Sequence, residues 1–189
     1  GGAYANRFAS LLEFLGIPYL VITDLDSVDP TNNRKVCRAD VNGAVTSNPS
    51  LKFFLNKSEV SELANLEADE LILADANGFI AFQKPTSVSG HNPESLMHGR
   101  TFEETFAYQN MQIFRDNEID LGSELPDDQD FEKEYTAVFE AIKSSSFKKV
   151  EFALNVASST ADWVTPQYIS DGLRWLEEKI CTKAQEKAT

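Results

Sequence analysis

Two aspartates, Asp24 and Asp26, directly follow a largely apolar run that covers residues 17–23. In a β-strand, side chains two positions apart point to the same face, so both carboxylates are expected on one face. If the run is a buried strand of a parallel sheet, they lie at its C-terminal edge, where α/β folds place their ligands. Two such carboxylates repel each other unless a cation binds, and carboxylate oxygens suit Mg²⁺ or Mn²⁺. The spacing therefore predicts a divalent metal site, with a solvated loop or a helix cap as the alternative.

Three further side chains could take part in catalysis or metal binding: Glu103, Glu104 and Lys149. Thr101 is a candidate N-cap, and both the helix dipole and a capping box favour acids in the following turn, which accounts for the two glutamates without a metal. A lysine beside an acidic metal cluster can hold a phosphate and stabilise its developing charge, although a solvated lysine is the ordinary case. On residue type alone these positions are weaker candidates than the aspartate pair.

These side chains must be positioned by the elements that the hydrophobic pattern predicts. Apolar residues at helical spacing indicate a helix over residues 5–15, which Gly16 ends. The strand of residues 17–23 follows, then a long polar loop, then a helix that begins at Pro49 behind Asn48 as its N-cap. The order of helix, short loop and apolar strand is typical of an α/β fold with a parallel sheet.

Two strands and then several helices are expected after residue 70. Residues 70–84 have the pattern of strand, turn and strand, with Asn77-Gly78 as the turn. Helical spacing then predicts two helices between residues 100 and 146, joined by an acidic loop, and a C-terminal helix that Pro166 opens. The two middle helices are interpreted as a helical hairpin inserted into the α/β core.

Composition limits the class of protein. The 189 residues carry a net charge of −13, which argues against simple binding of a phosphate backbone unless metal ions reverse the local sign. No apolar stretch is long enough to span a membrane, and Cys37 and Cys181 form no CxxC pair, so a cytoplasmic protein with reduced thiols is expected. His91 and His98 lack metal-ligand spacing and are expected at the surface.

Four motifs in order resemble one known family. They read LGIPYLVITDLDS at 15–27, GRTFEETF at 99–106, KVEFA at 149–153 and PQYISDGLRWL at 166–176. Together they resemble the C-terminal Toprim region of the OLD (overcoming lysogenisation defect) family of ATP-dependent endonucleases. The resemblance implies an α/β fold with a Toprim-like central parallel sheet flanked by helices. It divides the chain into a Toprim core over 1–99, a helical insertion over 100–146 and the C-terminal part of the core over 147–189.

The resemblance also implies an activity, which is the cleavage of DNA phosphodiester bonds with two Mg²⁺ or Mn²⁺ ions. Asp24 and Asp26 match the DxD metal ligands of the family, and Thr101-Phe102-Glu103 is similar to its TLE element. Glu103 is then the metal-side carboxylate, with Glu104 beside it as a further candidate ligand. Lys149 matches the catalytic lysine, and we expect it to act with Asp24 and Asp26 in two-metal hydrolysis.

One departure from the family pattern affects these expectations. The EGxxE-type segment that supplies further glutamates in the family does not occur in this chain. Neither does the N-terminal ABC-type ATPase domain, through which the family binds ATP and forms homo-oligomers. The chain is therefore interpreted as a fragment of a longer ATPase-nuclease, with little or no nuclease activity by itself, and phage defence is a role that the resemblance permits.

Two other interpretations remain open. DLDSV at 24–28 resembles the DxDx[TV] signature of haloacid-dehalogenase phosphatases, in which Asp24 would be the nucleophile and Asp26 the acid/base. In the second interpretation, the chain is a non-catalytic Toprim module that is used for assembly or for binding a partner. Formation of an aspartyl-phosphate on Asp24 would distinguish the phosphatase from the nuclease.

Overall fold

The computed structural model describes residues 2–73 and 76–186, with side chains up to residue 183. The chain divides into two compact units, which are called the first unit (Gly1–Lys84 with Gln167–Thr189) and the second unit (Pro85–Pro166). The described residues form both helices and short strands, two of which pair in parallel, so the predicted α/β class is confirmed. Within the part of the chain that the structure describes, no helix has the length and apolar character to cross a membrane.

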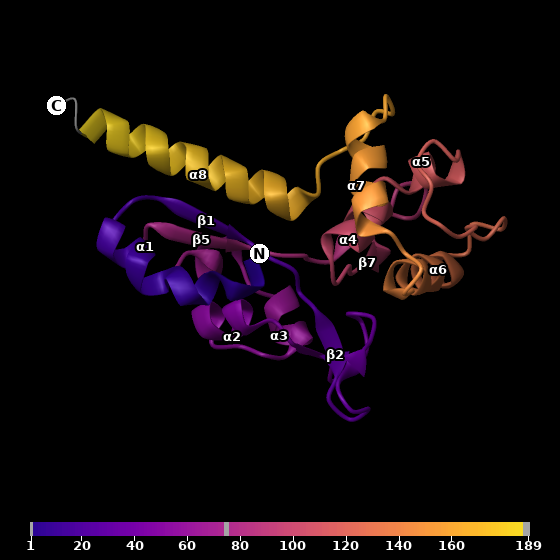
Figure 1. The fold of residues 1–189 in the computed structure, drawn as a ribbon, viewed down its shortest axis with the longest axis horizontal. Helices are drawn as coiled ribbons and strands as arrows, with labels where there is room; N and C mark the ends of the chain where they lie inside the picture. The colour runs from indigo at the N-terminus through magenta and orange to yellow at the C-terminus, as the bar shows by residue number, and fades with distance from the viewer. Residues whose placement is uncertain (1, 74–75, 187–189) are drawn as a thin grey trace. The chain divides into compact units, whose positions relative to one another are not determined.

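A pair of parallel strands lies at the centre of the first unit (Figure 1). Strand β1 (Tyr19–Ile22) pairs with β5 (Gly78–Ala81), with Tyr19 opposite Gly78. The parallel sheet that the sequence predicts is therefore present as two strands, and β1 ends at Ile22, just before the aspartate pair. All four residues of β5 are buried, which is the pattern of a strand covered on both faces.

Helices cover the two faces of this strand pair. On one face lies α8 (Gln167–Glu186), whose Trp175 ring stacks on Phe79 with ring centroids 5.2 Å apart. This close approach requires Gly172, because a Cβ there would come within 2.8 Å of the Leu20 side chain. The opposite face belongs to a second core cluster that contains Val21, Leu25, Leu51, Leu63, Ile80 and Phe82.

The remaining elements of the first unit are short and lie around this second cluster. The N-terminal segment forms η1 (Gly2–Phe8) and α1 (Ala9–Leu15), which Gly16 ends in the left-handed conformation as predicted. Two more helices are α2 (Pro49–Leu55) and α3 (Val60–Ala64). Asn48 caps α2 by accepting hydrogen bonds from the backbone N–H groups of Ser50 and Leu51, so the predicted start of this helix is confirmed.

Two predictions for the first unit were wrong in detail. The polar stretch after the aspartates contains a small antiparallel sheet in the order β3 (Lys35–Val36), β2 (Ser27–Asp29), β4 (Val45–Thr46). Among the described residues of 70–84, η2 (Ala68–Leu71) leads to an antiparallel bridge between Ile72 and Phe79 in place of the predicted first strand. β5 instead forms its regular ladder with β1, which lies far away in the sequence, and residues 72–73 meet its other edge through the bridge and the Leu73 N–H, which donates to the Gly78 carbonyl at 2.9 Å. Residues 74 and 75, part of the predicted hairpin, lie outside the described residues.

The second unit is helical apart from two very short strands, β6 (Thr86–Ser87) and β7 (Leu96–Met97). Its helices are α4 (Phe102–Gln109), α5 (Met111–Arg115), α6 (Phe131–Lys143) and α7 (Lys149–Ser158). They enclose one aromatic core, whose buried members include Phe106, Tyr108, Phe114, Tyr135 and Phe152. The unit extends over residues 85–166, whereas the resemblance predicts an insertion over 100–146, and those finer boundaries stay a prediction.

Candidate functional site

The aspartate pair lies in the loop that joins β1 to β2. Because β1 ends at Ile22, Asp24 and Asp26 are not strand residues, and Asp26 has a left-handed backbone with φ of 52°. The argument that strand geometry directs both carboxylates to one face was therefore wrong. Both side chains are partly buried, and their directions depend on how this loop is held rather than on the strand.

The loop is held by hydrogen bonds to its own backbone. Leu25 is fully buried in the core, its N–H donates to Gln83 Oε1 at 2.7 Å, and its carbonyl accepts from Thr46 Oγ1 at 2.5 Å. The carbonyl of Asp26 accepts from the Ser47 N–H at 2.9 Å. Since buried backbone groups are costly to leave unpaired, these bonds favour one conformation of the loop.

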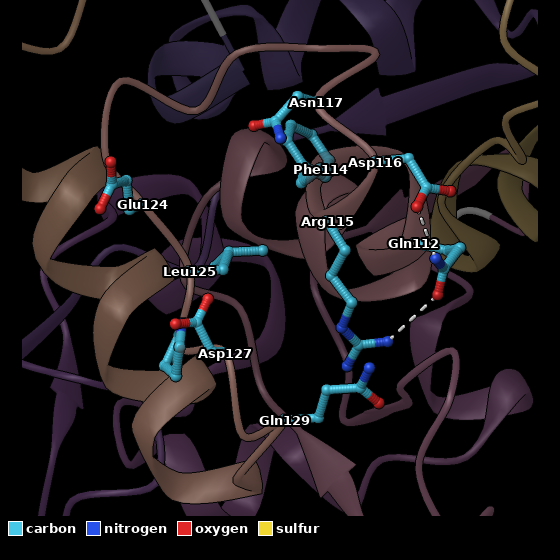
Figure 2. Close-up of a pocket in the computed structure, with 10 residues that line it drawn as sticks. Gln112, Phe114, Arg115, Asp116, Asn117, Glu124, Leu125, Asp127 and Gln129 are labelled. Carbon is cyan, nitrogen blue, oxygen red and sulfur yellow. Dashed lines mark hydrogen bonds between the residues drawn. The ribbon is translucent and has the colours of Figure 1, made fainter.

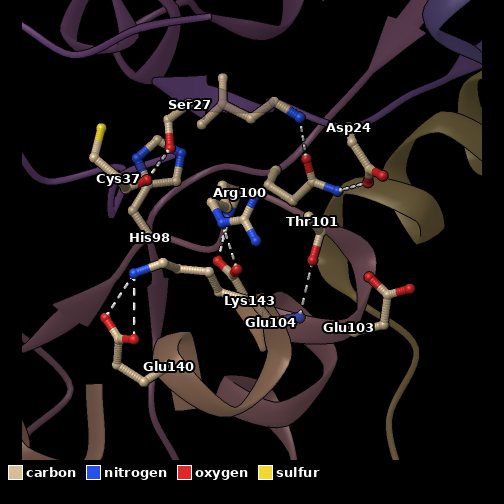
Figure 3. Close-up of polar contacts among 12 residues, drawn as sticks. Asp24, Ser27, Cys37, His98, Arg100, Thr101, Glu103, Glu104, Glu140 and Lys143 are labelled. Carbon is tan, nitrogen blue, oxygen red and sulfur yellow. Dashed lines mark hydrogen bonds and ion pairs between the residues drawn. The ribbon is translucent and has the colours of Figure 1, made fainter. Parts of the chain in front are cut away.

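Asp24 is anchored at both its carbonyl and its carboxylate. Asn48 Nδ2 donates to the Asp24 carbonyl at 2.5 Å, and Gln83 Nε2 donates to Asp24 Oδ1 at 2.7 Å; Figure 3 shows the second bond at the Asp24 carboxylate. Both amide side chains are buried, so the bonds form in surroundings where they are stronger than in water. The result is a carboxylate with a fixed position at the end of the parallel strand pair.

In the second unit, Glu103 and Lys149 meet. Thr101 caps α4, as predicted, and accepts a hydrogen bond from the N–H of Glu104, which places Glu103 in the first turn. Lys149 begins α7, and its Nζ lies 3.1 Å from Glu103 Oε1 and 3.2 Å from Oε2. The lysine side chain is 59% exposed and the glutamate side chain 12% exposed. The two residues that the family resemblance selects, 46 positions apart, therefore form one ion pair that solvent reaches from the lysine side.

Glu104 has a different environment from its neighbour. Its carboxylate is buried, lies 2.7 Å from Arg100 Nε and accepts a hydrogen bond from the Arg100 backbone N–H at 2.9 Å (Figure 3). The Arg100 guanidinium in turn lies over the Phe139 ring, 5.5 Å from its centroid. This arrangement ties the segment before α4 to α6, so Glu104 has an evident structural role. A metal ion would have to compete with Arg100 for it.

Sequence reasoning missed several residues that matter at these sites. Gln83 and Asn48 hold Asp24, although only the helix-capping role of Asn48 was expected. His91 and His98 were expected at the surface, but both are largely buried. His91 Nε2 lies 2.6 Å from Glu134 Oε2 in a cluster with Arg115, and the His98 carbonyl accepts from the Tyr135 hydroxyl. No local pattern signals such partners, because they come from distant segments.

A separate cleft of about 520 Å³ lies in the second unit (Figure 2). It is lined by residues of α5 and of the segment between α5 and α6, with Arg115, Asp116, Glu124 and Asp127 as its charged members. None of the predicted site residues lines it. The cleft therefore adds no support to the assignment of those residues.

Comparison with known proteins gives one informative match. Over 198 aligned residues the chain is 28% identical to Endonuclease GajA of Bacillus cereus (strain HuB5-5). The sequence is similar to that of an endonuclease. The alignment covers 95% of this chain but 26% of the relative, so the chain spans about a quarter of the length of that protein. No family model and no solved structure matches the chain.

The predicted metal ligands fall in different units. Asp24 and Asp26 belong to the first unit, and Glu103, Glu104 and Lys149 belong to the second. Across residues 2–73 and 76–186, no group of three or more His, Cys, Asp or Glu side chains is gathered as a metal site. The aspartate pair nevertheless fits a hard divalent cation, because it offers carboxylate oxygens on an anchored loop. Mg²⁺ commonly uses one or two carboxylates and takes its other ligands from water and substrate phosphates.

Proposed function

We propose that this chain is part of a metal-dependent endonuclease that hydrolyses DNA phosphodiester bonds by a two-metal mechanism. The main support for this type of reaction is the similarity to an endonuclease, which extends over 95% of the chain. The anchored aspartate pair and the Glu103–Lys149 ion pair supply side chains suited to that chemistry. The proposed cofactors are Mg²⁺ or Mn²⁺, because the candidate ligands are all carboxylates.

In this proposal Asp24, Asp26 and Glu103 hold the metal ions. Bound divalent ions supply an activated water and stabilise the leaving oxygen of the scissile phosphate. The chain's contribution is to present the carboxylates at fixed positions, and the hydrogen bonds to Asp24 serve that purpose at lower entropic cost than a mobile loop would. Glu104 remains a candidate ligand only if its ion pair with Arg100 opens.

Lys149 acts in this proposal on the charge of the scissile phosphate. Its Nζ is held by Glu103 and its side chain is 59% exposed, so a phosphate oxygen can approach the lysine without unfolding of α7. A cation that is oriented before the substrate arrives stabilises developing negative charge without reorganisation during the reaction. The ion pair with Glu103 also keeps the lysine close to a proposed metal ligand.

The proposal extends to the rest of a longer protein. The relative is about four times as long as the part that aligns, and we propose that this chain likewise works with further domains, an ABC-type ATPase domain among them. ATP would then act through that domain, and DNA and further copies of the same protein would be its partners. With a net charge of −13, this chain needs metal ions or basic surfaces elsewhere to hold DNA.

Cleavage of supercoiled plasmid in Mn²⁺ by the gene product that carries this chain tests the proposal. Lys149→Ala and Asp24→Ala are expected to lower the cleavage rate by about 100-fold or more, because the first removes the positive charge at the scissile phosphate and the second removes a ligand of the metal ions. Lys148→Ala is the matched control: it removes the neighbouring exposed lysine, and we expect the rate to stay within about twofold. Unchanged cleavage in Asp24→Ala would refute the assignment, and a phosphorylated Asp24 would indicate the phosphatase instead.

A further inference from the structure

Gln83 is a fully buried amide at the end of β5, and each end of it has a partner in the loop of the aspartates. Its Oε1 accepts from the Leu25 N–H at 2.7 Å, and its Nε2 lies 2.7 Å from Asp24 Oδ1 and 3.1 Å from the Tyr168 hydroxyl. These partners are 58, 59 and 85 positions away in the sequence. One side chain thus joins the end of β5, the loop after β1 and the start of α8.

The hydrogen bonds fix which way the amide faces. A backbone N–H can only donate, so the atom of Gln83 that faces Leu25 must be the oxygen. The NH₂ group then faces Asp24, whose ionised carboxylate can only accept. Because the backbone of Leu25 sets the orientation of the amide, Gln83 presents a donor to Asp24 before any ligand binds.

We propose that Gln83 is a positioning residue for Asp24: its amide orients the carboxylate so that Asp24 binds a divalent cation. This inference rests on the proposed function, in which Asp24 is a metal ligand. A carboxylate that receives a partly buried hydrogen bond at Oδ1 has less freedom to rotate about its side-chain torsions. Outer-shell donors of this kind orient metal ligands, and their loss weakens metal binding by about 10-fold to 100-fold.

A role for Gln83 in folding alone would not require this arrangement. The bond from Leu25 satisfies a buried backbone donor, and Oε1 provides it. The NH₂ end is directed at the Tyr168 hydroxyl and, at the shorter distance of 2.7 Å, at the partly buried Asp24 carboxylate. Because a substitution of Gln83 affects both ends, its metal affinity and its folding stability have to be measured together.

The test measures the Kd of Mn²⁺ for the 189-residue chain by calorimetry, alongside its urea unfolding. Gln83→Met removes the donor to Asp24 together with the acceptor for the Leu25 N–H, with little change in volume, and Asp24→Ala removes the ligand itself. Ser50→Ala is the matched control, because it removes the partly buried hydrogen bonds between the buried Ser50 hydroxyl and Asn6 in the same unit and leaves the side chains of the aspartate loop unchanged. We expect Gln83→Met to raise the Kd by about 10-fold to 100-fold, Asp24→Ala to abolish binding, and Ser50→Ala to stay within about twofold of wild type.

The outcomes separate this inference from the function on which it rests. If Asp24→Ala abolishes binding while Gln83→Met keeps the wild-type Kd, the inference is wrong and the metal site stands. If the wild-type chain binds no Mn²⁺, or Asp24→Ala binds it normally, the proposed metal site is wrong and the inference falls with it. If Gln83→Met does not fold, the side-chain NH₂ resonances of Gln83 decide in folded protein. They must shift in Asp24→Ala and on Mg²⁺ titration, and unshifted resonances overturn the inference.

Discussion

Glu134 is a buried carboxylate in the second unit, and its neutralisation should destabilise that unit strongly. Its side chain is 0% exposed and receives Arg115 in a two-point contact, Nε to Oε1 at 2.8 Å and Nη2 to Oε2 at 2.7 Å. His91 Nε2 lies 2.6 Å from Oε2. Burial by itself raises the pKa of Glu134, but the hydrogen bonds from Arg115 and His91 outweigh it and hold the pKa below the ordinary value.

The magnitude follows from what Glu134→Gln leaves behind. The Arg115 side chain is only 9% exposed, so the substitution leaves a buried guanidinium without its counter-charge. Removal of one member of a buried ion pair costs about 3–5 kcal/mol in the free energy of unfolding. Because Gln keeps the volume and one acceptor oxygen, we expect about 3 kcal/mol, which is roughly 12 °C or more in Tm for a unit of this size.

The assay is urea unfolding together with native-state hydrogen exchange at the buried amides of α6, which reports on the second unit alone. Glu140→Gln is the matched control on the same helix. Its carboxylate pairs with Lys143 at 3.0 Å and is 57% exposed, so it should cost less than about 0.5 kcal/mol. If Glu134→Gln and Glu140→Gln destabilise the unit equally, or if Glu134→Gln costs less than about 1 kcal/mol, the argument from burial is refuted.

Two further predictions concern positions beside the proposed site. Lys84 donates to the carbonyls of Leu63, Ala64 and Leu66, and burial lowers the pKa of its ammonium group to about 8. Between about pH 8 and the ordinary lysine pKa of 10.5, the unfolded chain therefore binds more protons at this position than the folded chain. The free energy of unfolding should then rise with pH, by about 1 kcal/mol after allowance for solvent screening. Urea unfolding at pH 7.5 and pH 10 checks this, and Lys84→Met should remove the rise. Gly99→Ala would place a Cβ 2.7 Å from the backbone nitrogen of Thr105 in α4, so it should lower the free energy of unfolding by about 1–3 kcal/mol. Urea unfolding measures this change, and an unchanged unfolding midpoint would contradict the close contact.

The local features of the fold were predictable because they depend on neighbours in the sequence. Gly16 ends α1, Asn48 caps α2 ahead of Pro49, and Thr101 caps α4, each through groups no more than four residues apart. The apolar run before Asp24 did become a strand of a parallel pair. Such signals fix the α/β class and place the candidate carboxylates after a strand and at the start of a helix.

The predictions from the sequence were wrong where a segment had several possible pairing partners, because long-range contacts decided between them. Residues 70–84 have a good hairpin pattern, yet β5 forms its regular ladder with β1 and only a bridge with Ile72, and the core clusters on its two faces bury it. The left-handed backbone at Asp26 is likewise invisible in the sequence and removes the strand geometry on which the first argument about the aspartates relied.

By itself the sequence determined the helix ends, the α/β class and, through the family resemblance, the residues proposed for chemistry. Only the tertiary structure decided which polar side chains meet: Gln83 with Asp24, Lys149 with Glu103, and Glu134 with Arg115. The physical reason is that a buried polar group must find a partner, and the partner is supplied by whichever distant segment the hydrophobic core brings near. Helix propensity and hydrophobic period describe the elements, but not which polar side chains they bring together.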